Sequence, residues 1–229
     1  MSKTFLAFSS VTKKITMAIA GLFLIVFLLV HLGINLFLLP IHDEHKEWFA
    51  AAAHFMGTNW LVKAFEIVLM AAFLIHILMG IILQIENWMA RGQGYKVASK
   101  SKTSFMSKYI IWTGITIFLF LIIHFYNFYF IKLGLIAAPD LANIAHPQED
   151  HFFELAVWLF TNDMVFNILY LIAFVALGIH LNHAFQSAFQ TLGLNHKKYT
   201  PFIKGMGQVF SIIIPAGFAI IPLYFMFIA

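Results

Sequence analysis

The chain has 229 residues, of which 62% are hydrophobic and only 10% are charged, and its formal net charge is +4 at pH 7. A soluble domain cannot bury that much apolar surface, so the composition predicts membrane-spanning helices, and the basic residues are too few and scattered for a nucleic-acid-binding face. The absence of cysteine excludes disulfides, covalently attached haem and cysteine-held iron–sulfur clusters on this chain.

Five apolar segments predict a bundle of five transmembrane helices, an all-α membrane domain over residues 1–229. The spans run over residues 15–39, 60–89, 108–131, 164–192 and 206–228. The first span is too long for the apolar region of a secretory signal and lacks a small-residue cleavage site, so we expect it to be retained. The connection over 132–163 is long and acidic, and we expect its stretch 147–162 to form a short helix in the outer interface.

The basic residues predict the orientation of the bundle. If the N-terminus is cytoplasmic, all Lys and Arg residues except Lys46, Lys63 and Lys132 lie on the cytoplasmic side. Cytoplasmic loops carry the excess of basic residues in membrane proteins. We therefore expect the N-terminus inside and the connection 132–163 outside.

Deep histidines are the main chemical signal in these spans: His31, His76, His124 and His180. An ionisable side chain at that depth is costly unless something binds it. At 1.5 Å of rise per residue, His31 and His124 lie roughly 12–14 Å below the outer ends of their helices, and His76 and His180 roughly 24–26 Å below. A lone histidine on an apolar helix is more often a packing residue, but four at two matched depths favour ligands. Depth predicts an outer pair, His31 with His124, and an inner pair, His76 with His180, the arrangement that holds two haems b.

Three further observations bear on these histidines. His183 lies one turn beyond His180 on the same face, and depth only slightly favours His180 as the ligand. Nine residues separate Gly21 from the histidine of the first span and Gly114 from that of the third, which hints at an internal two-helix duplication. Gly80, one turn after the histidine of the second span, would let a flat macrocycle approach the backbone.

The motifs at the two ends of the chain resemble a known family. The first comprises Ser9, Thr12-Lys13-Lys14, Gly21, His31 and Asn35, and the second is the run His180-Leu-Asn-His-Ala-Phe-Gln-Ser-Ala-Phe-Gln-Thr-Leu-Gly-Leu. Both resemble the cytochrome b subunit of succinate dehydrogenase and fumarate reductase, of the five-helix, dihaem type, and the resemblance covers nearly the whole chain. It implies that His180 is the ligand and that His183 is a candidate neighbour of the haem, near a propionate. The chain departs from some relatives at Gly178, where they carry a carboxylate of a proton path.

The resemblance implies a function as well as a fold. The chain would be the membrane anchor and electron-transfer subunit of a succinate:quinone oxidoreductase in a bacterial inner membrane. A flavoprotein subunit and an iron–sulfur subunit would lie on its cytoplasmic face, and two haems b would pass electrons between the clusters and membrane quinone, usually menaquinone. The direction of the reaction stays open, and so does the oligomeric state, a dimer of the whole complex included.

A quinone site needs an apolar slot beside a haem and groups that exchange protons. The candidates lie near the outer side of the first two spans: Asn35, His42, His45, Glu47, Trp48 and Glu66. Glu66 is unusual because it lies inside the second span, where it would either handle protons or bond to a neighbouring helix.

Two alternative functions remain open at this point. The first is the cytochrome b subunit of a hydrogenase or formate dehydrogenase, which also holds two haems. The second is a proton-coupled transporter without haem, in which the buried histidines relay protons. A reduced b-type spectrum separates the transporter from the cytochromes, and co-purifying flavin and iron–sulfur protein separate the two cytochromes.

Overall fold

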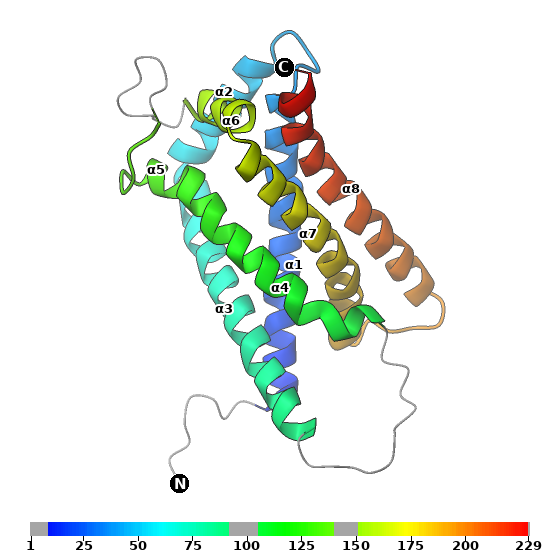
Figure 1. Cartoon of the computed structure of the whole chain (residues 1–229). Coiled ribbons are helices and arrows are strands. Elements are labelled where there is room, and N and C mark those ends of the chain that lie inside the picture. The colour runs from blue at the N-terminus through cyan, green and yellow to red at the C-terminus, as the bar shows by residue number, and fades with distance from the viewer. Residues whose placement is uncertain (1–8, 92–104, 140–150, 229) are drawn as a thin grey trace.

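The structure, a computed structural model, describes residues 9–91, 105–139 and 151–228, and all regular structure within these ranges is helical. Five helices are long and apolar enough to cross a membrane: α1 (Ser10–Asn35), α3 (Trp60–Arg91), α4 (Phe105–His124), α7 (Met164–Thr191) and α8 (Thr200–Phe227). The predictions of an all-α chain and of five spans are confirmed (Figure 1). The orientation stays a prediction, and many of the basic residues behind it, in 1–8 and 92–104, lie outside the described residues.

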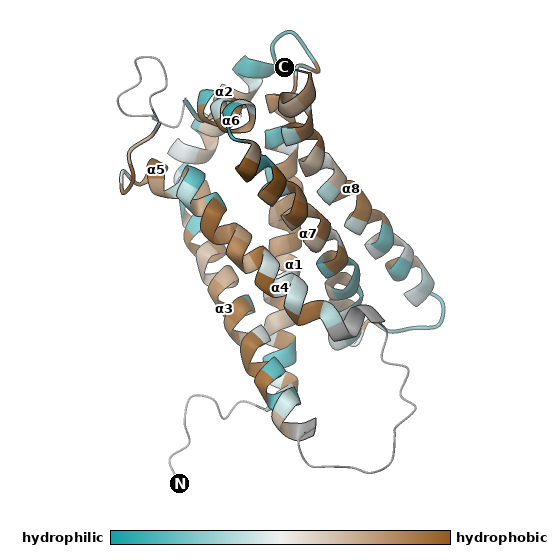
Figure 2. Ribbon diagram, viewed as in Figure 1, coloured by the Kyte–Doolittle hydropathy of each residue, from teal (hydrophilic) through white to brown (hydrophobic). Residues whose placement is uncertain are grey.

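The outside of the bundle is apolar. Ile67 and Leu74 of α3 and Val175 of α7 are among its exposed large hydrophobic side chains. Figure 2 shows hydrophilic residues gathered toward the helix ends and in the connecting segments. An apolar band between polar ends is the surface that a lipid bilayer requires. The chain is therefore a multi-pass membrane protein.

Three helices begin earlier than hydropathy predicts, α4 by three residues and α1 and α8 by five and six. α1 begins at Ser10 rather than at residue 15, because the Ser9 hydroxyl accepts a hydrogen bond from the Thr12 N–H at 3.1 Å and caps the helix. α8 begins at Thr200 rather than at residue 206, with Pro201 in its first turn, where proline's missing N–H is not needed. In α1 and α8 the first turns are polar, so hydropathy does not register them.

The side of the bundle nearest the C-terminus of α8 carries two short helices, α2 (His45–Thr58) and α6 (Phe152–Asn162) (Figure 1). They contact each other through the rings of Phe49 and Phe153, whose centroids are 5.7 Å apart. The helix expected within 147–162 is present from Phe152, and residues 147–150 lie outside the described residues. Its placement in a membrane interface stays a prediction. In the predicted orientation this is the outer end.

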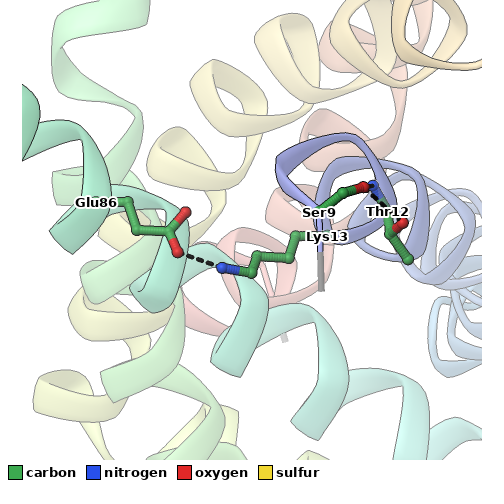
Figure 3. Close-up of polar contacts among 4 residues, drawn as sticks. All are labelled: Ser9, Thr12, Lys13 and Glu86. Carbon is green, nitrogen blue, oxygen red and sulfur yellow. Dashed lines mark hydrogen bonds and ion pairs between the residues drawn. The ribbon is translucent and has the colours of Figure 1, made fainter. Parts of the chain in front are cut away.

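The opposite end of the bundle joins α1 to α3 through an ion pair. The Lys13 ammonium donates to the Glu86 carboxylate, and Lys13 is only 7% exposed (Figure 3). Burying an ammonium is costly unless a partner compensates it, so this contact sets how the two helices meet.

The central helices pack closely around an apolar core. α1 contacts α3, α7 and α8, and α4 packs along α7. A Cβ built on Gly217 of α8 would lie 2.9 Å from Leu32 Cδ2 of α1, so glycine at this position lets the two helices pack closely with Leu32 in its present place. This packing fixes α1, α3, α4 and α7, the four helices that carry the candidate histidines.

Candidate haem-binding histidine pairs

The four deep histidines lie in two pairs inside the bundle. The ring centroids of the outer pair, His31 of α1 and His124 of α4, are 5.8 Å apart with an interplanar angle of 84°. Those of the inner pair, His76 of α3 and His180 of α7, are 6.3 Å apart at 74°. These are the two pairs that the depth argument predicts. It is the ring of His180 that faces His76, while His183 lies one turn further along α7 and is half-buried.

The spacing within each pair fits a metal held between two imidazoles. A metal–nitrogen distance of about 2.0 Å on each side, with the half-width of each ring added, places two ring centres about 6 Å apart. Both pairs have this separation. The residues present therefore fit a group with two axial histidine ligands, such as a haem b.

In each pair, the histidine from the α4–α7 half has a hydroxyl neighbour at its Nδ1 atom. The Nδ1 of His180 lies 3.3 Å from the Thr113 hydroxyl, and that of His124 lies 3.4 Å from the Tyr170 hydroxyl. Asn127 donates a hydrogen bond of 3.3 Å to the same tyrosine oxygen. Groups at Nδ1 orient an imidazole and leave Nε2 to face its partner.

The histidines of the α1–α3 half have different surroundings. Asn35 uses its amide to donate to the backbone carbonyl of His31 at 2.8 Å, with the same nitrogen 3.4 Å from the ring Nδ1. The ring of Phe27 stacks on His31, with centroids 5.1 Å apart. The Nδ1 of His76 is buried and has no hydrogen-bond partner among the described residues, and the His76 imidazole interacts with the backbone of Met17.

The repeated glycine–histidine spacing has a structural reason. A Cβ on Gly21 of α1 would lie 3.3 Å from His76 Cε1, and one on Gly114 of α4 would lie 3.7 Å from His180 Cε1. Each glycine therefore lies at the inner pair, and the histidine ten residues later belongs to the outer pair. Ten residues of helix separate the two levels by about 15 Å, more than the roughly 10–12 Å between the two depths predicted from the helix ends. The helix pairs α1–α3 and α4–α7 thus repeat one arrangement, as a duplication predicts.

Gly80 and Gly178 differ in how much space surrounds them. A Cβ on Gly80 would meet nothing within 4 Å among the described residues, so the space there is open. A Cβ on Gly178 would lie 2.9 Å from the Ser211 carbonyl oxygen of α8. The carboxylate that some relatives carry at that position would not fit here without moving α8.

The polar groups considered for quinone chemistry lie in two places. His42 stacks on Trp48 with ring centroids 4.6 Å apart, and the Nδ1 of His45 is 2.9 Å from the Phe37 carbonyl. His42 lies in the segment before α2, and His45 and Trp48 lie in α2 itself. Glu47 also lies in α2 and is exposed.

Glu66 has a partner on another helix. Its two carboxylate oxygens accept from the Lys132 ammonium at 3.2 and 3.3 Å, where Lys132 ends α5 (Phe130–Lys132). The same ammonium lies 5.9 Å from the centroid of the Tyr129 ring. The contact is therefore an ion pair between helices, the second of the two roles expected for Glu66, in which Lys132 neutralises the carboxylate.

Sequence reasoning missed the partners of the histidines. Thr113, Asn127 and Tyr170 look like ordinary polar residues of apolar spans. Asn127 lies in η2 (Phe125–Tyr129), a π-helical turn that directly follows His124. Such turns often mark functional sites, but hydropathy and helical periodicity do not predict them. The adjacency of Thr113 to Gly114 was the one signal that could have drawn attention to it.

No family model, curated protein or solved structure matched the chain. The resemblance to the dihaem cytochromes b therefore rests on the quoted motifs and stays a prediction.

Proposed function

We propose that the chain is the membrane anchor and electron-transfer subunit of a succinate:quinone oxidoreductase in a bacterial cytoplasmic membrane. The observation that carries the proposal is the presence of two facing imidazole pairs at two levels of one helical bundle. The histidine-rich motif that begins at His180 favours this family over the cytochromes of hydrogenase and formate dehydrogenase. A transporter that relays protons has no need of two imidazole pairs at nearly right angles, each with its ring centres about as far apart as two ligands of one metal.

The four histidines have the leading roles in this proposal. His31 and His124 would hold the outer haem, and His76 and His180 the inner one. A bound haem supplies an iron that takes up and gives back single electrons. Because the two levels are about 15 Å apart along α1 and α4, the pairs span about half of a hydrocarbon core of roughly 30 Å. The side chains thus divide one crossing of the membrane into short steps.

The partners follow from what the chain lacks and from its charge. With no cysteine, it needs an iron–sulfur subunit to bring electrons to the inner pair and a flavoprotein subunit to react with the dicarboxylate. Lys197, Lys198 and Lys204 lie in and beside the turn between α7 and α8, at the end closer to the inner pair. In the predicted orientation these basic groups face the cytoplasm and the iron–sulfur subunit.

Quinone would react at the other end, near the outer pair. His42, before α2, and Glu47, within α2, are exposed and are available to exchange protons with water. Asn35 and His45 are engaged with backbone carbonyls, which suits them to shape the site rather than to carry protons. Glu66 would take part only if its ion pair with Lys132 opened. Menaquinone is the expected quinone, from the resemblance alone.

Purification of the tagged chain from its native membrane tests the proposal. We expect a flavoprotein and an iron–sulfur protein to co-purify, a b-type spectrum that succinate reduces, and reoxidation of that spectrum by a soluble menaquinone analogue. A colourless complex would contradict the cytochrome function. A b-type spectrum that hydrogen or formate reduces but succinate does not would assign the chain to another quinone-linked enzyme.

A further inference from the structure

Helices α4 and α7 support each other's histidine reciprocally. Thr113 of α4 contacts His180 of α7, and Tyr170 of α7 contacts His124 of α4, each at Nδ1. One contact belongs to the inner pair and the other to the outer pair. Both hydroxyl-bearing side chains are buried, Thr113 at 8% and Tyr170 at 2% exposure, so water does not compete for them.

The Thr113 hydroxyl offers the Nδ1 of His180 a hydrogen-bond acceptor. The Thr113 hydroxyl donates its own hydrogen to the Ile110 carbonyl at 2.9 Å. Toward His180 it therefore has only oxygen lone pairs to offer, and it must accept from an Nδ1–H group. With its proton on Nδ1, a neutral imidazole has its free lone pair on Nε2, the tautomer that can bind iron through Nε2.

The Tyr170 contact is held in place by its surroundings. The tyrosine ring meets Phe120, Phe160 and Phe174 edge to face, with centroid distances of 4.9, 5.4 and 6.1 Å. Its hydroxyl oxygen accepts from Asn127, which is 6% exposed and is placed by the π-helical turn. When Nε2 of His124 is bound to iron, its Nδ1 carries the ring proton, and the remaining lone pair of the tyrosine oxygen accepts that hydrogen. The ring cage and the amide together fix the oxygen at one point beside the histidine.

The other half of the bundle offers no equivalent. Among the described residues, neither His31 nor His76 has a hydroxyl at Nδ1. The Nδ1 of His31 lies near the Asn35 amide nitrogen, and the buried Nδ1 of His76 has no hydrogen-bond partner. Each pair therefore combines one imidazole with a fixed hydroxyl acceptor and one without.

From this asymmetry we propose that Thr113 and Tyr170 are positioning residues, one for each haem, which hold His180 and His124 with Nδ1–H directed at a hydroxyl oxygen and Nε2 directed at the iron. This inference rests on the proposed function, because it assumes that the pairs hold haem. An acceptor at Nδ1–H makes an imidazole a stronger donor to its metal and stabilises the ferric state. Removal of either hydroxyl raises the midpoint potential of one haem and leaves the other unchanged.

The test is a redox titration of the purified complex, with each haem assigned by the histidine variants that remove it. Thr113→Val keeps the side-chain shape without the hydroxyl, and Thr113→Ser keeps the hydroxyl as the matched control. We expect Thr113→Val to raise only the potential of the haem that His76→Ala and His180→Ala remove, and Thr113→Ser to titrate as wild type. Tyr170→Phe should raise only the potential of the haem that His31→Ala and His124→Ala remove.

Three results would overturn the inference: no shift in either variant, a shift of the same haem in both, or an equal shift in Thr113→Ser and Thr113→Val. Each of these requires a wild-type complex with two haems, so they are distinguishable from a failure of the proposed function, in which the wild type holds no haem. If Tyr170→Phe does not fold, the Thr113 series alone decides the question for the inner pair.

Discussion

Gly21 offers a sharp test of how closely α1 approaches the inner histidine pair. An alanine at this position would place its Cβ 3.3 Å from His76 Cε1 and 3.4 Å from Nδ1, whereas an alanine at Gly114 would place its Cβ 3.7 Å from His180 Cε1. The second distance is an ordinary van der Waals contact, and the first is 0.4 Å shorter. Gly21→Ala therefore has to push the His76 ring away from α1, and Gly114→Ala does not move His180.

The expected magnitude follows from this crowding. Overpacking by one methyl group costs about 1–3 kcal/mol, which corresponds to roughly 5- to 150-fold weaker retention of the inner haem. Alanine in place of glycine inside a helix otherwise favours the helix by about 1 kcal/mol, so Gly114→Ala should be neutral or slightly stabilising.

The assay is the transfer of each haem from the purified protein to excess apomyoglobin, followed by its absorbance. Gly21→Ala should release the inner haem faster than wild type and the outer haem at the wild-type rate. Equal behaviour of Gly21→Ala and Gly114→Ala, or faster loss of the outer haem, would refute the placement of Gly21 against His76.

Two further substitutions test the packing around the site. Gly178→Ala places a Cβ 2.9 Å from the Ser211 carbonyl oxygen. We expect it to lower the free energy of unfolding of the solubilised protein by about 1–3 kcal/mol. A melting curve identical to that of the wild type would show that α8 can move aside without loss of stability. Lys13→Met leaves the Glu86 carboxylate without its partner. It should therefore destabilise the protein more than Lys14→Met, which changes an exposed residue. The double variant Lys13→Met/Glu86→Met should recover part of the lost stability, because it removes both charges. Equal melting temperatures for the two lysine variants would contradict this reading of the ion pair.

The five spans could be predicted because hydropathy is a property of about 20 consecutive residues and tolerates local exceptions. Helix ends depend on single side chains. The Ser9 cap and the Pro201 first turn extend α1 and α8 into polar sequence that a hydropathy window excludes. The helix within 147–162 was recognisable for the same reason as the spans, since its apolar residues cluster.

The pairing of the histidines could also be predicted, since helix rise converts residue number into depth. The distance between the pairs could not be predicted as well, because depth was measured from the ends of different helices, and these ends do not lie at one level. The contacts of Gly21 and Gly114 compare both pairs along a single helix and therefore give the better value of about 15 Å.

The contacts of individual polar side chains were beyond sequence reasoning. The basic-residue count placed Lys132 on the outer side but gave no sign that it pairs with Glu66 of α3. Thr113 and Tyr170 reach the histidines of a helix distant in sequence, and a single chain without relatives offers no covariation to reveal such pairs. The π-helical turn that places Asn127 has no signature in hydropathy or helical periodicity.

The haem content of the wild-type protein and of its histidine variants tests the central claim most directly. The account predicts two haems b per chain in the wild type and in His183→Ala. It predicts one haem in each of His31→Ala, His76→Ala, His124→Ala and His180→Ala. His31→Ala and His124→Ala should lose the same spectral component, and His76→Ala and His180→Ala should lose the other. A wild-type protein without haem, or one that loses haem with His183→Ala and keeps both with His180→Ala, would contradict the account.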